Sequence, residues 1–178
     1  MFEISDTVYG YKMLLNQKNE IYTSGISISD STRIDIATSK YDSLGNKKWL
    51  QTYHNPSFLN NDYFRDFVID DSGNSYVTGA SPIGMELAWD IVTLKYNSLG
   101  ELKWAQRYDS IYNSSDEPQS IAVDKSGNIY VTGHTNFNLF ANWYITISYD
   151  SIGNQRFVLF YNNGLPFHNH EAKIIKTD

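Results

Sequence analysis

Side chains that could bind or transform a ligand are concentrated in segments of the sequence that do not repeat. They combine aromatic rings, carboxylates and imidazoles, which together suit a sugar or a peptide, because rings offer stacking area and carboxylates direct hydrogen bonds. The candidate ligand-binding residues are Asp62, Tyr63, Trp89, Asp116, Glu117, His134, Trp143, His168 and His170. Trp143 departs most from the pattern, because Asp35 and Asp90 hold the corresponding positions. Packing and solvation of loops is the alternative interpretation of each residue.

No pattern in the sequence indicates catalysis. The chain has no cysteine and no Gly-x-Ser-x-Gly motif, so the common nucleophiles lack their usual setting. Glycoside hydrolysis needs two acids about 5 to 10 Å apart, and Asp62 would have to converge with Asp116 or Glu117 to provide them. A carbohydrate-active hydrolase or lyase that uses these carboxylates therefore stays an alternative to a non-catalytic module.

Metal binding has weak support. His168 and His170 place two imidazoles on one side of an extended segment, where a third ligand would have to come from elsewhere. The Asp-x-Ser-Gly-Asn segments at 70–74 and 124–128 place oxygens at alternate positions, but they lack the spacing of glycine and acid in an EF-type calcium loop. We therefore expect plain hairpin turns there, and neither a metal nor a cofactor.

An internal repeat predicts the elements that position these residues. GNSYVTG at 73–79 returns as GNIYVTG at 127–133, which is 54 positions later, and a weaker copy, NEIYTSG, lies at 19–25. A second block recurs as KYDSLGNKKW at 40–49, KYNSLGELKW at 95–104 and SYDSIGNQRF at 148–157. The chain therefore consists of three units of about 54 residues.

Each unit has four segments rich in Val, Ile, Tyr, Thr and Trp, bounded by Gly, Asn, Asp and Ser, which is typical of an antiparallel β-meander with tight turns. In the middle unit these segments are 66–70, 75–80, 90–96 and 102–108. Repeated four-stranded meanders indicate β-propeller blades. We predict an all-β chain with blades at residues 11–54, 65–108 and 119–161 and one extra strand at 172–178.

Large aromatic side chains recur at two positions of the repeat. One set is Tyr22, Tyr76 and Tyr130, and the other is Trp49, Trp104 and Phe157. Recurrence favours a packing role over a binding role, because a ligand site has no reason to be copied in every unit. We expect these rings to fill the space between adjacent blades.

The motif D-x-S-G-N-x-Y-V-T-G, followed by an Asp-Ile-x-Thr-x-Lys-Tyr strand and Gly-x-x-x-Trp, resembles the bacterial seven-bladed β-propeller repeat family. The resemblance spans nearly the whole chain and is weakest in the first unit, where Asn19-Glu20 replaces Gly-Asn. It implies a propeller fold, usually within large exported proteins, and no catalytic residues. We therefore expect a secreted or cell-surface location, although Met1 to Gly10 has no signal-peptide pattern.

Strand parity places the variable segments on one side of the predicted propeller. Turns from first to second strand and from third to fourth emerge together, and they are short and repetitive. The remaining connections emerge on the opposite side, which we name the long-loop side: 26–33, 54–65, 81–89, 109–119, 134–142 and 162–170. Because binding residues usually lie in the variable loops of a rigid scaffold, we expect the ligand site on the long-loop side.

Composition and architecture limit the partners. The net charge is -6 and no basic cluster exceeds Lys47-Lys48, which argues against nucleic acid and anionic membranes. No apolar run approaches the roughly 20 residues of a transmembrane helix. Three blades leave two open edges, so we expect further blades or copies of the chain to complete the ring. The leading hypothesis is a non-catalytic binding or structural scaffold for a protein or glycan ligand, with a self-assembling structural unit as an alternative.

Overall fold

The computed structural model describes residues 7–29, 33–55, 61–82, 88–110, 114–138, 141–161 and 175. Within these ranges the regular secondary structure consists of β-strands. No helix among them has the length and hydrophobicity that crossing a bilayer requires. The predicted extra strand at 172–178 lies, apart from Ile175, outside the described residues.

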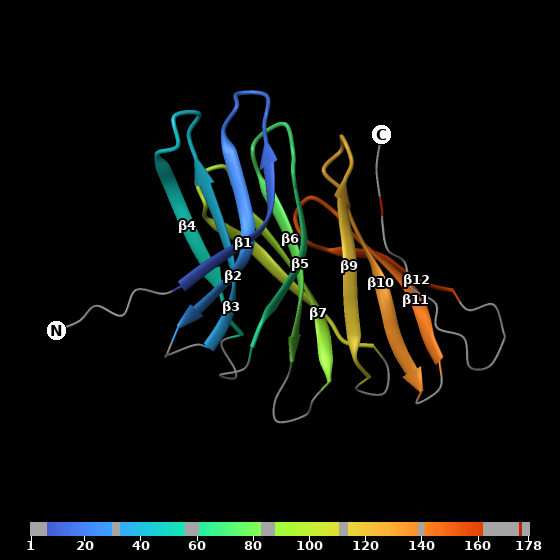
Figure 1. Cartoon of the computed structure of the whole chain (residues 1–178). Coiled ribbons are helices and arrows are strands. Elements are labelled where there is room, and N and C mark those ends of the chain that lie inside the picture. The colour runs from blue at the N-terminus through green and yellow to red at the C-terminus, as the bar shows by residue number, and fades with distance from the viewer. Residues whose placement is uncertain are drawn as a thin grey trace.

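The strands form three four-stranded antiparallel sheets in which neighbours follow chain order (Figure 1). Blade 1 contains β1 (Thr7–Leu15), β2 (Ile21–Ser29), β3 (Arg33–Tyr41) and β4 (Lys47–Tyr53). Blade 2 contains β5 (Tyr63–Ile69), β6 (Ser75–Pro82), β7 (Trp89–Tyr96) and β8 (Leu102–Tyr108). Blade 3 contains β9 (Asp116–Val123), β10 (Ile129–Asn138), β11 (Ala141–Tyr149) and β12 (Gln155–Tyr161). The all-β, propeller-like fold class is therefore confirmed.

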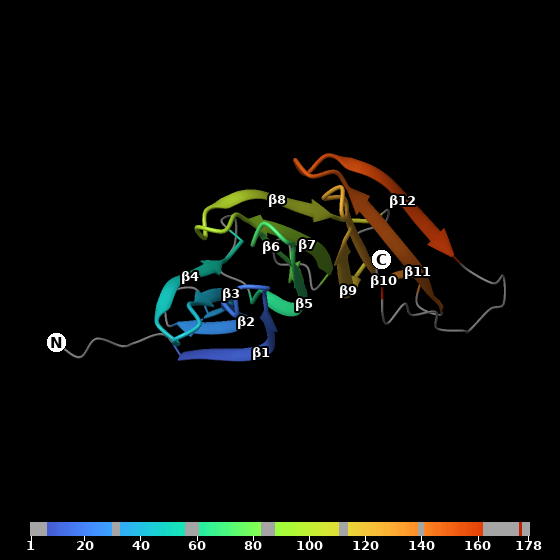
Figure 2. The ribbon, with the colours of Figure 1, turned by 90° about the horizontal axis from the view of Figure 1, so that it is seen from above.

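The three blades follow one another in an arc, with β1, β5 and β9 on its inner side (Figure 2). Strand β5 contacts both β1 and β9, so the first strands of the blades lie side by side. The turns that join the first strand of each blade to the second lie together at the top in Figure 1. The long-loop side is the opposite end of the sheets.

The short turns depend on a residue that tolerates a left-handed backbone. In blade 2 the amide of Asn74 donates to Asp70 Oδ1 at 2.9 Å, and Gly73 has a φ of 80°. Few residues besides Gly and Asn adopt such a φ at low cost. The corresponding residue of blade 1 is Asn19, with a φ of 58°. The turn therefore persists where the first unit departs from the repeat.

The first strand of each blade is longer than its repeated core. In blade 2 the pairing of β5 with β6 shifts register between Phe64 and Asp66, and pairing then continues to Tyr63. Strand β5 therefore begins ahead of residue 65, where the sequence predicts the blade to start. Blade 1 has the same irregularity, and β1 begins at Thr7 rather than at residue 11. The repeat in the sequence fades at this bulge, whereas the hydrogen bonding extends beyond it.

Cross-strand register sorts the side chains of each blade onto two faces. In blade 2, Tyr76 is paired with Val68 and with Lys95, so these three side chains share one face. Val77 is paired with Leu94 and lies on the other face. We name the face toward the following blade the leading face, and the face toward the preceding blade the trailing face.

Adjacent blades bury a leading face against a trailing face. Between blades 1 and 2, Tyr22 lies in one apolar cluster with Phe67 and Val77. Between blades 2 and 3, Tyr76 lies in a second cluster with Ile121. All five side chains are almost completely inaccessible to solvent. The prediction that Tyr22 and Tyr76 fill the space between blades is confirmed.

Each joint between blades also contains a ring that lies against a glycine. Trp49 covers Gly100 so closely that a Cβ atom on this glycine would lie 2.7 Å from Trp49 Cγ. The indole Nε1 donates to the carbonyl oxygen of Ser98 at 3.3 Å. Trp104 repeats the contact at Gly153, where a Cβ atom would lie 2.9 Å from Trp104 Cγ. The ring fits because the residue beneath it has no side chain.

One carboxylate connects the innermost strands of all three blades. Asp66 Oδ1 accepts a hydrogen bond from Lys12 Nζ at 2.6 Å. Asp66 Oδ2 accepts from Ser120 Oγ at 3.0 Å and from the amide of Ile121 at 3.1 Å. Lys12, Asp66 and Ser120 hold the same repeat position, 54 residues apart. Charge-assisted bonds of this kind are stronger than neutral ones and fix the register between blades.

Two glycine substitutions separate backbone strain from the contact with the ring. Gly45 and Gly100 have almost the same φ, 84° and 85°, but nothing lies within 4 Å of a Cβ atom built on Gly45. We expect Gly45→Ala to cost about 1 to 2 kcal/mol from the left-handed backbone alone. Gly100→Ala should cost about 1 to 3 kcal/mol more, because its methyl group overlaps Trp49. Urea denaturation of both variants, at concentrations at which the chain is monomeric, measures the difference.

Equal losses in the two variants would contradict the packing role of Trp49. The packing role would also be contradicted if Gly100→Ala lowered the free energy of unfolding as much in a Trp49→Ala background as it does in the unmodified chain. The double variant tests the contact directly, because removal of the ring makes room for the new methyl group.

Candidate functional site

Two aspartates on the long-loop side hold the connections between blades. Asp116 Oδ2 accepts a hydrogen bond from the amide of Ser110 at 2.6 Å, and Asp62 Oδ2 accepts from the amide of Asn55 at 2.8 Å. Both side chains are fully buried. A carboxylate that binds backbone amides in this way fixes the chain between the last strand of one blade and the first strand of the next. These two predicted ligand-binding residues therefore stabilise the connections.

Burial changes the ionisation of both carboxyls. Desolvation raises the pKa of Asp116 to about 6, against hydrogen bonds from Thr135 and Ser110 that lower it. Desolvation likewise raises the pKa of Asp62. A carboxyl with a pKa near 6 has the ionisation of a general acid, but a side chain without solvent exposure cannot reach a substrate.

Three carboxylates meet at the long-loop side between blades 2 and 3. One oxygen of each of Asp90, Asp109 and Asp116 lies within 4.8 Å of the others. Among the described residues, this group has the geometry to hold a cation. The guanidinium of Arg107 compensates part of its charge, because Arg107 Nη2 lies 3.1 Å from Asp90 Oδ2. Asp109 is the exposed member of the group.

Arg107 is a site residue that the sequence interpretation missed. Its guanidinium donates to Ser81 Oγ at 2.7 Å and to the carbonyl oxygen of Ser81 at 2.6 Å, besides Asp90. Thr52 and Phe160 hold the equivalent position in the fourth strands of blades 1 and 3, and neither is charged. The charge of Arg107 at a position that is uncharged in the other two units was the available signal.

Tyr63 and Trp89 form an aromatic pair on the long-loop side. Their ring centroids lie 5.0 Å apart at an interplanar angle of 61°. Polar groups flank the pair, because Asn61 Nδ2 donates to the Tyr63 hydroxyl at 3.2 Å and the amide of Trp89 donates to Ser115 Oγ at 3.4 Å. Both rings are half-buried. The structure thus brings together two predicted residues in an arrangement that can stack a ligand.

The remaining predicted residues have separate neighbours. Glu117 forms an ion pair with Arg65 at 2.7 Å. His134 is buried, and its Nδ1 has no hydrogen-bond partner. The ring of Trp143 meets Phe160 edge-on, at 6.4 Å between centroids. His168 and His170 lie outside the described residues.

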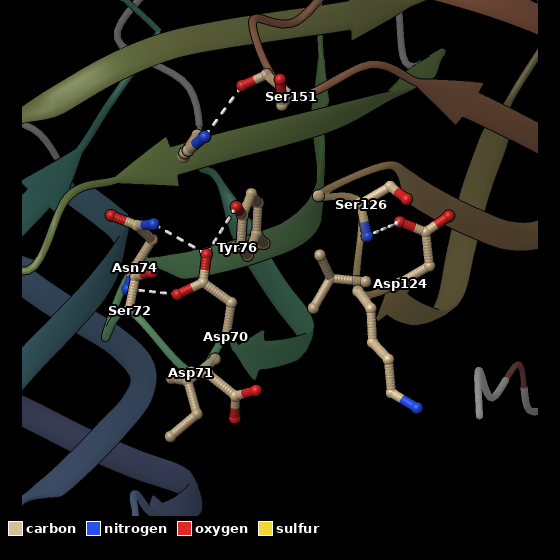
Figure 3. Close-up of a pocket in the computed structure, with 13 residues that line it drawn as sticks. Asp70, Asp71, Ser72, Asn74, Tyr76, Asp124, Ser126 and Ser151 are labelled. Carbon is tan, nitrogen blue, oxygen red and sulfur yellow. Dashed lines mark hydrogen bonds between the residues drawn. The ribbon is translucent and has the colours of Figure 1, made fainter.

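A pocket of about 500 Å³ lies on the opposite side, between the short turns of blades 2 and 3 (Figure 3). The Tyr76 hydroxyl donates to Asp70 Oδ2 at 2.9 Å, and Asn74 Nδ2 donates to the same oxygen at 2.7 Å. Lys95 Nζ donates to the carbonyl oxygen of Ser151 at 2.8 Å. The lining groups therefore bind one another, and the bond from Lys95 to Ser151 crosses the joint.

A second pocket, of about 560 Å³, occupies the same place between blades 1 and 2. Its lining includes Asn16, Lys40 and Ser98, which correspond to Asp70, Lys95 and Ser151 of the first pocket. Repetition at both joints indicates that these pockets arise from blade packing. The sequence predicts the ligand site on the other side, where the aromatic pair lies.

Comparison with known proteins supports the repeat. Residues 103–141 match the Beta-propeller repeat family (SBBP), which confirms the resemblance to a bacterial β-propeller repeat family. No curated protein matches the sequence. Among solved structures, the chain is similar to an alpha-L-arabinofuranosidase (CtGH43) from Clostridium thermocellum ATCC 27405, with a TM-score of 0.43 and 16% identity over 84% of this chain and 52% of that one. The chain thus spans about half the length of that protein, and this similarity carries no functional argument.

The pH dependence of stability tests the burial of Asp116. Its pKa of about 6 in the folded state exceeds the ordinary value near 4, so this group stabilises the fold below pH 4 and the contribution is lost as the pH rises to 6. The Asp116→Asn variant has no carboxyl to ionise at this position, so its stability does not fall for this reason as the pH rises. We expect the free energy of unfolding of the variant, relative to the unmodified chain, to increase by about 2 to 3 kcal/mol from pH 4 to pH 7. Urea denaturation across this range measures it.

Asp124→Asn is the matched control. The hydrogen bond from Asn128 lowers the pKa of Asp124, so this group stabilises the fold above its ordinary pKa and the contribution is lost on acidification. The relative stability of this variant should fall as the pH rises from 3 to 7. If both variants change in the same direction, the assignment of a buried, hard-to-ionise Asp116 is wrong.

Proposed function

We propose that the chain is a non-catalytic propeller scaffold that binds a protein or glycan ligand through Tyr63 and Trp89 on the long-loop side. The observation that carries the proposal is the half-exposed aromatic pair, with rings 5.0 Å apart and flanked by hydrogen-bonding groups. Stacking rings beside amide and hydroxyl groups recognise extended polar ligands such as sugar chains and peptides.

The environments of the carboxylates favour a non-catalytic scaffold over a hydrolase. Asp62 and Asp116 are fully buried and accept hydrogen bonds from backbone amides. Glu117 is ion-paired with Arg65. An acid pair in a glycosidase must flank the scissile bond of a bound sugar, and two of these three acids have no exposed surface.

Location and further partners belong to the same proposal. The exported or cell-surface location follows from the family resemblance alone. Additional blades, supplied by a longer chain or by a second copy, would cover the exposed outer faces of blades 1 and 3.

Substitution of the aromatic pair tests the binding site. We expect a screen against glycans and bacterial surface proteins to identify a ligand whose dissociation constant rises at least tenfold, or about 1.4 kcal/mol, in Tyr63→Ala and in Trp89→Ala. Isothermal titration measures the affinity, and thermal unfolding verifies that each variant is folded. Ile152→Ala is the control, because Ile152 is 73% exposed on the short-turn side of blade 3.

Equal affinity in all three variants would contradict the proposed site. Turnover of a polysaccharide by the unmodified chain, lost in Glu117→Gln, would favour the hydrolase instead.

A further inference from the structure

The two joints within the chain show which residues the leading face and the trailing face of a blade contribute to a joint. A leading face contributes a tyrosine and a tryptophan, with ring centroids 6.2 Å apart for Tyr22 and Trp49 and 6.5 Å for Tyr76 and Trp104. The following blade contributes a turn whose glycine lies directly beneath the tryptophan. The joint therefore has a ring half and a glycine half.

Blade 3 presents a ring half on its leading face. Tyr130 and Phe157 hold the positions of the tyrosine and the tryptophan, and their ring centroids lie 6.4 Å apart. Phe157 is 36% exposed. Among the described residues, no blade follows to supply a glycine turn beneath it.

Blade 1 presents a glycine half on its trailing face. Gly45 has a φ of 84°, as the covered glycines do, but nothing lies within 4 Å of the position that its Cβ atom would take. Leu44, which precedes this glycine in the turn, is 86% exposed, and Met13 on the same face of blade 1 is 61% exposed. This turn therefore has the shape that Gly100 and Gly153 have, without a ring upon it.

The centre of this trailing face is more polar than its counterparts. Thr23 and Ser39 stand where blade 2 has Val77 and Leu94, and their hydroxyl oxygens are 2.7 Å apart. Because the two hydroxyls hydrogen-bond to each other, covering them costs less free energy than covering two unpaired hydroxyls. The smaller apolar area predicts a weaker joint than the internal ones.

We propose that the leading face of blade 3 docks on the trailing face of blade 1 of a second copy of this chain. The occupant follows from the internal joints, because the free glycine turn fits a ring on a leading face and blade 3 supplies one. Two copies joined in this way at both ends would give a closed ring of six blades, within the size range of propellers. This inference does not depend on the ligand proposed above.

Light scattering after size exclusion tests the joint. Across about 1 to 100 µM, we expect the unmodified chain to reach a mass of twice 20.4 kDa. Gly45→Asn keeps the left-handed turn, because Asn tolerates this backbone, and its side chain occupies the place of the ring. Phe157→Ala removes the ring. Each substitution should raise the dissociation constant of self-association at least tenfold.

Mixing the two variants identifies the direction of the joint. The ring of the Gly45→Asn variant and the free turn of the Phe157→Ala variant remain intact, so the mixture should form a heterodimer through one joint. Leu99→Ala is the control, because Leu99 is 73% exposed on the turn of blade 2 and should leave the mass unchanged.

A chain that is monomeric at all these concentrations would overturn the proposal. So would a dimer whose dissociation constant changes with neither substitution, or variants that do not associate when mixed. We expect both variants to fold, because Phe157 is partly exposed and Gly45 has no neighbour within 4 Å of its Cβ position. Thermal unfolding of each variant verifies this, so that weaker association is not mistaken for loss of the fold.

Discussion

The structure depends on the stacking of one blade against the next. A four-stranded meander of this composition carries apolar side chains on both faces, and neither face can be covered from within the same blade. The trailing face of blade 2 buries Phe67 and Val77 only because Tyr22 of blade 1 lies against them. The ring of Trp49 extends this contact to the turn at Gly100, where one glycine supplies both the left-handed backbone and the space for the ring.

Polar groups at the ends of the joints follow from this stacking. Once two blades are in contact, the chain that connects them is partly buried, and its amides need acceptors. Asp62 and Asp116 provide these acceptors. Because they are buried, the pKa of each carboxyl is raised. Arg107 compensates Asp90 at the same end of blade 2. The long-loop side is therefore the place where the chain between blades is secured, and it also carries the pair Tyr63 and Trp89 through which we propose ligand binding.

The sequence was sufficient for most of the architecture, because strands, turn glycines and stacked rings are copied from unit to unit. The candidate site was predicted less well. Asp62 and Asp116 were selected because they lie in segments that do not repeat, yet they are 54 positions apart and hold equivalent places, which signals a structural role. Arg107 was overlooked although the residues at its position in the other units, Thr52 and Phe160, are uncharged. The roles of these residues depend on contacts between blades, and the sequence pattern within one unit does not reveal those contacts.

The network around Asp66 has a consequence for how such genes change length. Its bonds join residues at one repeat position in successive units, and the ring contacts likewise connect only neighbouring units. Unequal recombination that inserts or deletes one whole unit would leave every surviving joint with both of its halves. The number of blades can therefore vary among descendants of such a gene without loss of a ring contact, whereas the bonds of Asp66 would have to be replaced, because Lys12, Asp66 and Ser120 differ at this repeat position.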